Sequence, residues 1–382
     1  MKLCFVSAYP PNRGNLSEYG AYLSQSLAKQ DELNEISILA NKNENSPDIE
    51  SNGKIKVIRC WKNNDIFTPI RILRAVLRES PDIVHFNIHM KNWGEGKLAN
   101  FIGASTPYVV KLITGKKIIV TLHNIAEAVD LKEIGEKDSV VNSIGIYVAT
   151  SLILKADMVT TTLKRFESML EKKYNAHNVV TVYLGTPGKL ADEVKTGGNT
   201  ILSFGYWSNP KNLPFLIETF MELKHEDEKM KLIIAGGSHP YYRNYLDSIK
   251  ENYETVDGIE FTGYVPENQI KDVFGKSSVV VLPYTTALGT SAVVHLAASY
   301  GKPIIITDLP ESRDITDEIG LELLLFPKND KEALKNEIRS LLNDESKQSS
   351  IIHKNLKIAE DHSFDNISKT YVKLYDELVG KG

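Results

Sequence analysis

The sequence predicts an α/β protein made of two doubly wound, Rossmann-like domains in tandem. At 382 residues the chain is too long for one ordinary α/β core, and its 42% hydrophobic and 25% charged residues are typical of globular proteins. Short apolar segments alternate with amphipathic stretches, as in a parallel sheet covered by helices on both faces. The alternation stops near residues 185–188 and restarts near residue 201, so we expect two such sheets.

In the first half, the apolar segments lack strict alternation, which favours buried parallel strands. We expect strands at 3–7, 83–87, 117–123, 158–162 and 179–184. We expect helices at 17–29, 69–77, 140–155 and 163–174.

In the second half, the same rhythm predicts strands at 201–205, 232–235, 259–263, 279–284, 303–307 and 323–326. It predicts helices at 213–223, 242–252, 267–274, 291–300 and 331–342, with a last helix at 365–378. Between the halves, a polar stretch rich in Gly and Lys is typical of a linker. The predicted domains are therefore 1–186 and 201–362, with a linker at 187–200 and a C-terminal segment at 363–382.

Composition limits the possible partners and compartment. The net charge of -4 gives no reason to expect a nucleic-acid partner. Residues 1–186 carry 23 Lys+Arg and 19 Asp+Glu, so the first half could face an anionic acceptor or a membrane surface, although scatter among solvated helix faces explains the same imbalance. Cys4 and Cys60 form no disulfide or metal pattern, and the apolar segments at residues 3–8 and 140–154 are too short for a signal core or a membrane span. We expect a cytoplasmic protein.

Two strand ends of the first half carry candidate binding residues, because ligands of open α/β sheets bind at the carboxyl ends of the strands. Gly14 and Asn15 lie in the loop after the first strand, where glycine permits close approach and a helix N-terminus favours anions. An ordinary loop with Ser17 as helix cap is the alternative. His123 ends another strand and would point into the crevice, unless it is a hydrogen-bonded structural histidine; His85 is a weaker candidate of the same kind, as is His89.

Three strand ends of the second half carry further candidates. Gly205 and Tyr206 open a loop that leads to Lys211, whose ammonium could neutralise a diphosphate as a point charge. A solvated surface lysine is the alternative. The turns with the base-binding candidates Gly237, Tyr264 and Val265 could each let a flat base approach the backbone, or could be plain turns.

The segment around residues 283–301 is the most informative. A buried strand enters a loop of small residues, Gly289, Thr290 and Ser291, and a helix follows at once. The unsatisfied N–H groups and the dipole at that helix start would bind a diphosphate without a metal. His295 lies one turn into the helix, on a side that could meet a ribose, or it is a packed helix-face histidine.

The ordered set of these segments resembles the retaining nucleotide-sugar glycosyltransferases of the GT-B fold, the glycosyl transferases group one class (family 4). The likeness covers nearly the whole chain and rests on these segments: Tyr-Pro-Pro-Asn-Arg-Gly at 9–14, Pro-Asp-Ile-Val-His at 81–85, Val-Thr-Leu-His at 120–123, Phe-Gly through Lys at 204–211, Thr-Gly-Tyr-Val-Pro at 262–266, His-Leu-Ala-Ala-Ser-Tyr-Gly-Lys-Pro at 295–303 and Asp-Leu-Pro-Glu at 308–311. The resemblance implies two Rossmann-like domains that face each other across a cleft, with the acceptor on the first and the donor on the second. It also implies that the C-terminal segment, 363–382, crosses back to the first domain, because Ser-Phe-Asp-Asn-Ile at 363–367 resembles the family's crossing helix.

The resemblance further implies a UDP- or GDP-sugar donor, an acceptor hydroxyl on a glycan or a lipid-linked molecule, and no metal or cofactor. Lys211 and the helix start at Ser291 would stabilise the leaving diphosphate, and His123 would orient the transferred sugar. Two departures stand out: the family's paired Glu positions read Leu288 and Leu296 here, and its Arg after the first glycine reads Tyr206. A nucleotide-sugar epimerase of the same fold and a catalytically silent nucleotide-sugar-binding subunit remain alternatives.

Overall fold

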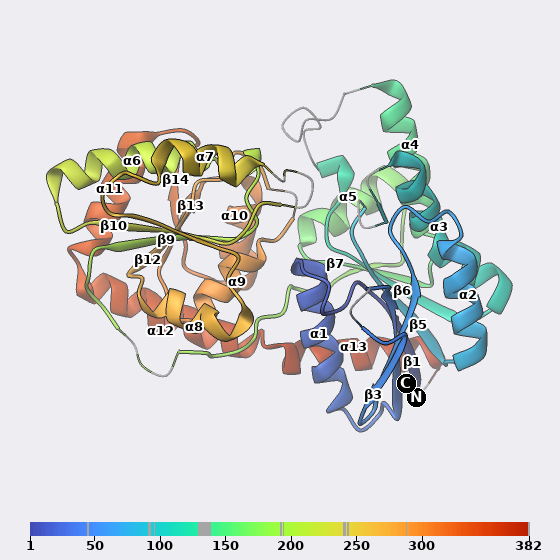
Figure 1. Ribbon diagram of the computed structural model, residues 1–382. Helices are drawn as coiled ribbons and strands as arrows, with labels where there is room; N and C mark the ends of the chain where they lie inside the picture. The colour runs from blue at the N-terminus through green and yellow to red at the C-terminus, as the bar shows by residue number, and fades with distance from the viewer. Residues whose placement is uncertain are drawn as a thin grey trace. The chain divides into compact units, whose positions relative to one another are not determined.

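The computed structural model describes residues 1–43, 46–90, 93–94, 96–128, 139–191, 193, 195–239, 242, 244–287 and 289–380. Their contacts divide the chain into two compact units. The first unit holds Met1–Ala128 together with the described parts of Lys137–Gly185 and Phe364–Gly382, and the second holds the described part of Thr186–Ser363. Figure 1 places both ends of the chain in the first unit.

The first unit is built on a twisted sheet whose described strands run in the order β3-β4-β2-β1-β5-β6-β7-β8. All neighbours pair in parallel except β3 and β4, which are antiparallel. The strands are β1 (Lys2–Val6), β2 (Glu35–Asn41), β3 (Ile49–Asn52), β4 (Ile55–Trp61), β5 (Ile83–Ile88), β6 (Lys117–Leu122), β7 (Met158–Thr161) and β8 (Val179–Thr181).

Helices cover both faces of this sheet. The connection from β1 leads to β2 on one side, whereas the connections from β4 through β5 to β8 lead the other way along the sheet. Because such crossovers are right-handed, the two directions put their helices on opposite faces. One face carries α1, which packs against the C-terminal helix α13; the other carries α2, α3 and α4, which lie side by side in that order. The described helices are α1 (Asn15–Ala28), α2 (Thr68–Glu79), α3 (Lys97–Thr114), η1 (Ala126–Ala128), α4 (Val140–Ile153), α5 (Lys164–Tyr174) and α13 (Phe364–Val379).

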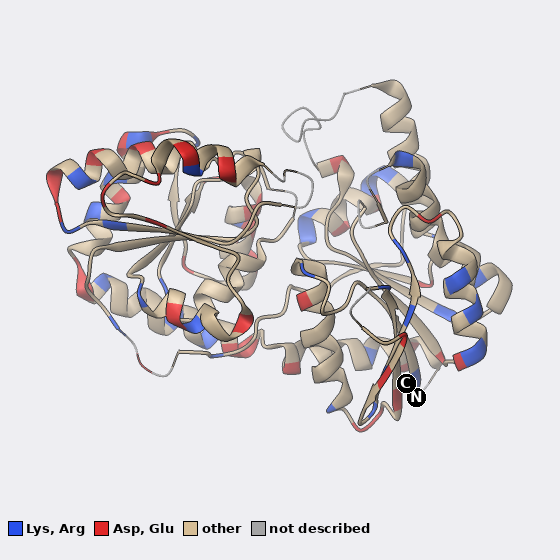
Figure 2. Cartoon of the chain, in the orientation of Figure 1, with Lys and Arg blue, Asp and Glu red and all other residues tan. Residues whose placement is uncertain are grey.

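The second unit repeats the plan with a parallel sheet in the order β11-β10-β9-β12-β13-β14 among the residues described. Its strands are β9 (Thr200–Phe204), β10 (Lys231–Ala235), β11 (Ile259–Gly263), β12 (Val279–Leu282), β13 (Ile304–Thr307) and β14 (Leu324–Phe326). Its helices are η2 (Asn209–Lys211), α6 (Leu213–Glu226), α7 (Tyr245–Tyr253), α8 (Glu267–Gly275), α9 (Ala292–Ser299), α10 (Pro310–Asp314), η3 (Ile315–Ile319), α11 (Lys331–Leu342) and α12 (Glu345–Asp361). In both units the charged side chains lie mainly on the helices and loops, whereas the central strands carry few (Figure 2).

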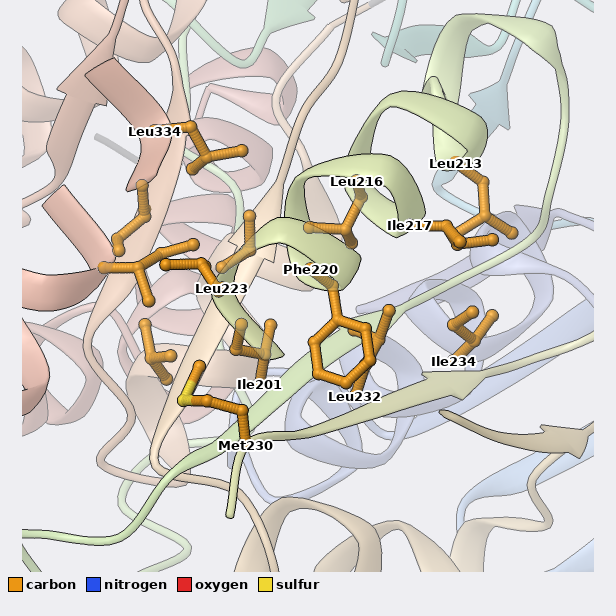
Figure 3. Packing of buried hydrophobic residues seen from close by; sticks show 14 of the residues in the cluster. Ile201, Leu213, Leu216, Ile217, Phe220, Leu223, Met230, Leu232, Ile234 and Leu334 are labelled. Carbon is orange, nitrogen blue, oxygen red and sulfur yellow. The ribbon is translucent and has the colours of Figure 1, made fainter. Parts of the chain in front are cut away.

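The core of the second unit forms between the sheet and the apolar side of α6 (Figure 3). Leu213, Ile217 and Phe220 recur at the spacing of one helix face and are fully buried. They pack with Ile201 and Leu232 from the neighbouring strands β9 and β10. This packing fixes the strand ends, where the candidate residues of this unit lie.

The predicted fold class is confirmed: each unit is a doubly wound α/β domain with a mainly parallel sheet. Several elements were not predicted, namely β2, β3, β4, α3, α10 and α12. The segment predicted as a linker packs on the second unit, since Leu190 and Ala191 donate backbone hydrogen bonds to the Ser299 carbonyl. The chain passes between the units at two neighbouring points, because Thr186 and Ser363 form a parallel β-bridge.

Candidate functional site

Three strand ends of the first unit bring polar side chains together at one edge of the sheet. Asn87 lies at the end of β5, and its amide Nδ2 donates to Ser7 Oγ, which follows β1, at 2.9 Å. The Ser7 hydroxyl donates in turn to the Ala8 carbonyl at 2.7 Å. On its other side, Asn87 Oδ1 lies 2.5 Å from Nε2 of His123, which follows β6.

This chain of hydrogen bonds determines the tautomer of His123. The amide of Asn87 presents an oxygen to the ring, so His123 Nε2 carries the proton and donates it. Nδ1 is then left with a lone pair, which can accept a hydrogen bond from a hydroxyl group. The sequence places His123 at a strand end, and the structure adds the partner that orients it.

The surroundings of His123 keep its ring neutral. The side chain is only 8% exposed, and the edge-on ring of Tyr19 packs 4.4 Å from it. Burial lowers the pKa of His123 well below its ordinary value, and the neighbouring histidines His89 and His85 lower it further. A neutral imidazole at pH 7 can accept a proton or a hydrogen bond, but it has no positive charge that would attract an anion.

His85 lies deeper under the same sheet edge and is structural. Its Nδ1 lies 2.7 Å from the Tyr375 hydroxyl on α13, and its Nε2 lies 2.7 Å from Thr121 Oγ1. Burial lowers the pKa of His85 to about 3, so the ring is neutral. His89, the other weak candidate, is half-buried and stacks on His123 with ring centroids 5.4 Å apart.

The loop after β1 is anchored by a buried arginine. Arg59 is almost completely buried, and its guanidinium donates to the Pro10 carbonyl at 2.6 Å. Gly14 has a φ of 134° and open space where a Cβ would stand, and it forms the N-cap of α1, which begins at the exposed Asn15. The alternative in which Ser17 caps this helix is wrong, because the helix starts two residues earlier.

In the second unit, the turns after β9, β10 and β11 meet at the sheet edge. Gly236 has a φ of 114°, and a Cβ there would lie 1.9 Å from the Gly205 carbonyl oxygen, so only glycine fits. Gly237 lies beside Tyr264, since a Cβ on this glycine would be 3.8 Å from the Tyr264 Cβ. Tyr264 is 38% exposed, whereas Val265 is buried. Of the candidates predicted for base binding, Gly237 and Tyr264 thus lie side by side, whereas Val265 and His295 are buried.

Lys211 lies against the loop that leads to α9. Its Nζ is 3.6 Å from the centroid of the Tyr284 ring, which provides a cation–π contact. The Tyr284 hydroxyl lies 3.5 Å from Ser291 Oγ, and Ser291 is the N-cap residue of α9 but makes no side-chain capping bond. A backbone hydrogen bond of 2.9 Å from Thr285 to Pro210 ties the two loops together. The ammonium and the helix start therefore create a local site for an anion.

The remaining candidates of this unit belong to the same two loops, which carry Lys211 and the start of α9. Tyr206 follows Gly205 and is half-buried, as are Gly289 and Thr290 in the loop before α9. Leu288, one of the two positions where the family carries Glu, lies outside the described residues, and Leu296 is half-buried on α9. Within the described ranges, no three His, Cys, Asp or Glu side chains come together as metal ligands would.

The expectation that His295 is open to a ribose is corrected by the structure. Its ring is 1% exposed, and neither ring nitrogen has a hydrogen-bond partner. Burial lowers the pKa of His295 to about 3, with a smaller contribution from His362. The residue packs inside the unit because α9 is buried on the side that carries Val294 and Ala298.

Comparison with known families identifies this second domain. Residues 198–344 match the family model described as glycosyl transferases group 1. The match to the group 1 glycosyl transferases thus covers most of the second unit. Over its whole length, the chain superposes on sucrose-phosphate synthase from Thermosynechococcus elongatus with a TM-score of 0.77 and 17% identity, covering 100% of both chains. Anabaena HepE, solved in complex with UDP-glucose, superposes with a TM-score of 0.71 and 14% identity over 99% of this chain and 100% of that one. The chain therefore has the GT-B fold.

Two curated relatives share shorter segments with this chain. One is an uncharacterized glycosyltransferase of Methanocaldococcus jannaschii, 25% identical over 47% of this chain and 46% of its own length. The other is alpha-monoglucosyldiacylglycerol synthase of Streptococcus pneumoniae, 23% identical over 36% of this chain and 30% of its own length. The chain thus spans less than half the length of either curated relative.

Sequence reasoning missed two residues that complete these arrangements. Asn87 lies two positions after His85 in the same strand, so the period of two was a signal that both side chains lie on the same face of the sheet. Tyr284 follows a buried strand and precedes the loop of small residues, but nothing in its spacing indicates that its ring lies under Lys211.

Proposed function

We propose that this protein is a retaining glycosyltransferase that moves a sugar from a nucleoside-diphosphate sugar to an acceptor hydroxyl without a metal ion. The position of Lys211 carries the proposal. Its ammonium lies over Tyr284 and beside the start of α9, in the domain that matches the group 1 family. The two loops are joined by a backbone hydrogen bond, so this charge is preorganised.

The chemistry follows from where charge develops. The bond from the anomeric carbon to the diphosphate oxygen breaks, and that oxygen gains negative charge. Lys211 and the N–H groups at the start of α9 stabilise this charge more in the transition state than in the ground state, which lowers the barrier. The acceptor oxygen bonds to the anomeric carbon on the same face, and its proton passes to the departing phosphate.

His123 contributes as a neutral hydrogen-bond acceptor. Its Nε2–H is bound to Asn87, so Nδ1 can receive a sugar hydroxyl and orient the transferred sugar. The low pKa of the ring keeps it in this form at neutral pH. In this proposal His123 acts on the sugar and Lys211 acts on the diphosphate.

Donor and acceptor are proposed by class. HepE was solved with UDP-glucose, which supports a UDP-sugar, and a GDP-sugar is the other candidate. The name of the Streptococcus pneumoniae relative supports a lipid-linked acceptor, and a glycan is the alternative. Two free cysteines agree with a cytoplasmic location.

The test is transfer itself. Labelled UDP- and GDP-sugars would be incubated with the protein, EDTA, and either a lipid extract or soluble glycans, and the anomeric configuration of the product would be read by NMR. We expect acceptor-dependent release of the nucleoside diphosphate and a product that keeps the donor configuration. An inverted product would contradict the retaining mechanism, and activity only after magnesium is added would contradict metal independence.

One observation favours a second candidate, a catalytically silent nucleotide-sugar-binding subunit. Leu296 stands where the family carries a Glu, so a carboxylate contact to the ribose is missing. Tight binding of nucleotide sugars without turnover on any acceptor would favour this candidate. Incubation with donor alone also separates transfer from epimerisation, because an epimerase converts the sugar without an acceptor.

A further inference from the structure

The outer surface of α2, α3 and α4 exposes more large apolar side chains than water-facing helices usually do. Val141 on α4 is 78% exposed, Leu112 on α3 is 70% exposed and Leu77 on α2 is 58% exposed. These helices lie side by side on one face of the first unit. We call the outward faces of the three helices, together with the two residues before α2, the α2–α4 surface; its exposed apolar residues are Ile66, Phe67, Ile70, Leu77, Leu98, Phe101, Leu112, Ile113, Val140, Val141, Ile144, Tyr147 and Val148.

The helix α4 is the most unusual part of this surface. It has no charged residue over its whole length, and Val140, Ile144 and Tyr147 recur at the spacing of one helix face. That face is exposed rather than packed on the sheet. Contiguous apolar patches of this kind on a soluble unit mark a surface that meets a partner.

The basic residues of these helices indicate that the partner is anionic. The segments 66–78, 96–126 and 139–156, which contain α3, α4 and all of α2 except its last residue, carry Lys and Arg but no Asp or Glu. The last residue of α2, Glu79, is acidic, but its side chain is buried against Lys56. Their basic residues are Arg71, Arg74, Arg78, Lys97, Lys111, Lys116, Lys117 and Lys155. Figure 2 shows this as blue without red along α2, except at its last residue, and no red on α4.

Acidic residues at the edge do not cancel this charge. Asp65 pairs with Arg71 at 2.8 Å, and Asp157 pairs with Lys111 at 3.1 Å. Arg74 and Arg78, in contrast, make no ion pair with any described residue, and both are exposed. On α2 they alternate with Ile70 and Leu77, so apolar and basic side chains share one outward face.

We propose that the α2–α4 surface docks the first unit onto the surface of an anionic phospholipid bilayer. Apolar side chains would enter the headgroup region while the arginines and lysines contact lipid phosphates. None of the described helices is long and apolar enough to cross a membrane, so the contact lies along the bilayer surface. A second copy of the chain fits less well, because a two-fold interface would bring two basic surfaces together.

The test uses the whole chain and phospholipid vesicles, without any sugar donor, so its result does not depend on the proposed transfer reaction. We expect the protein to cosediment with vesicles of equal parts phosphatidylglycerol and phosphatidylcholine, and to stay in solution with phosphatidylcholine alone. Binding should weaken as salt is raised, because the arginines and lysines contribute electrostatically.

Two variants separate the apolar and the electrostatic contributions. The triple change V140S/V141S/I144S and the double change R74E/R78E should each weaken the partition coefficient on anionic vesicles by at least about tenfold. All these positions are exposed, so thermal unfolding without vesicles should be unchanged. The matched control K369E/K373E makes the same charge change on exposed positions of α13, on the opposite face of the sheet, and should bind nearly as the unmodified protein does.

Three results would overturn the proposal. The first is no binding of the unmodified protein to anionic vesicles. The second is equal loss in the control and in R74E/R78E, which would mean that overall charge alone decides. The third is a concentration-dependent dimer in analytical ultracentrifugation that the triple change abolishes, which would assign the surface to a second copy.

Discussion

Replacing Lys211 by Met removes the charge of the side chain and keeps most of its apolar length. The ammonium lies 3.6 Å from the Tyr284 ring centroid, and the shorter methionine side chain can keep an apolar contact with this ring but not the charge. If Lys211 is a surface lysine, this change is nearly silent. If it stabilises the leaving diphosphate, turnover falls while the fold persists.

The structure sets the size of both effects. Losing a partly exposed cation–π contact costs about 0.5–1 kcal/mol of folding free energy, and the methionine offsets part of it. An ammonium in contact with a phosphate oxygen, about 4 Å away at an effective dielectric of about 20, contributes about 4 kcal/mol. We therefore expect kcat/KM to fall by about 10²–10³ with an unfolding free energy within about 1 kcal/mol of the unmodified protein.

The assay is kcat/KM with the active nucleotide sugar, alongside urea unfolding. Lys276→Met is the matched control, because Lys276 is exposed at the end of α8 in the same unit. It should change neither quantity. Equal kcat/KM for Lys211→Met and the control would refute the assignment of Lys211 to the diphosphate.

Three further predictions concern the histidines. His123→Ala should lower kcat by at least about tenfold and leave the Kd for the nucleoside diphosphate nearly unchanged in calorimetry, because the diphosphate is proposed to bind the second unit; a comparable loss of affinity would contradict this proposed position. Asn87→Asp places a carboxylate next to the Nε2 proton and raises the pKa of His123. The ring of the variant is then protonated at low pH and can no longer accept a hydrogen bond, so kcat/KM should fall there while that of the unmodified protein does not. Identical pH profiles would contradict the role of Asn87 in keeping His123 neutral. Burial lowers the pKa of His295 to about 3 from 6.5, so the unfolded chain binds the extra proton between these values and stability is lost as pH falls. His295→Leu should therefore shrink the loss of unfolding free energy between pH 7 and pH 5 by about 2 kcal/mol in urea titrations, and an unchanged loss would mean that the ring is not buried in solution.

The fold class could be predicted because buried parallel strands leave short apolar runs at regular spacing. The elements that were missed lack that signal. All four residues of β3 are exposed at the antiparallel edge, so no apolar pattern marks it. The helix α3 contains Pro107 and Gly103, which break a helical pattern; a Cβ at Gly103 would lie 1.9 Å from Trp93, so close packing explains this glycine.

The candidate residues could be predicted in position but not in their contacts. The carboxyl ends of parallel strands lie together at one edge of a sheet, where ligands bind. The sequence could therefore place His123 at this edge of the first sheet, and Gly205 and Lys211 at this edge of the second. The partners depend on tertiary packing, as with Tyr284 under Lys211 and Asn87 beside His123. The prediction that His295 contacts a ribose is wrong for the same reason, because its helix is buried on more sides than the sequence spacing indicates.

The central claim, that Lys211 and the start of α9 hold a nucleoside diphosphate without a metal, is tested most directly by calorimetry. UDP and GDP would be titrated into the protein in EDTA, and then into Lys211→Met. We expect one of the two nucleotides to bind the unmodified protein, and the variant to bind it at least about tenfold more weakly. Binding that appears only after a divalent ion is added, or that is equal in the variant, would contradict the account.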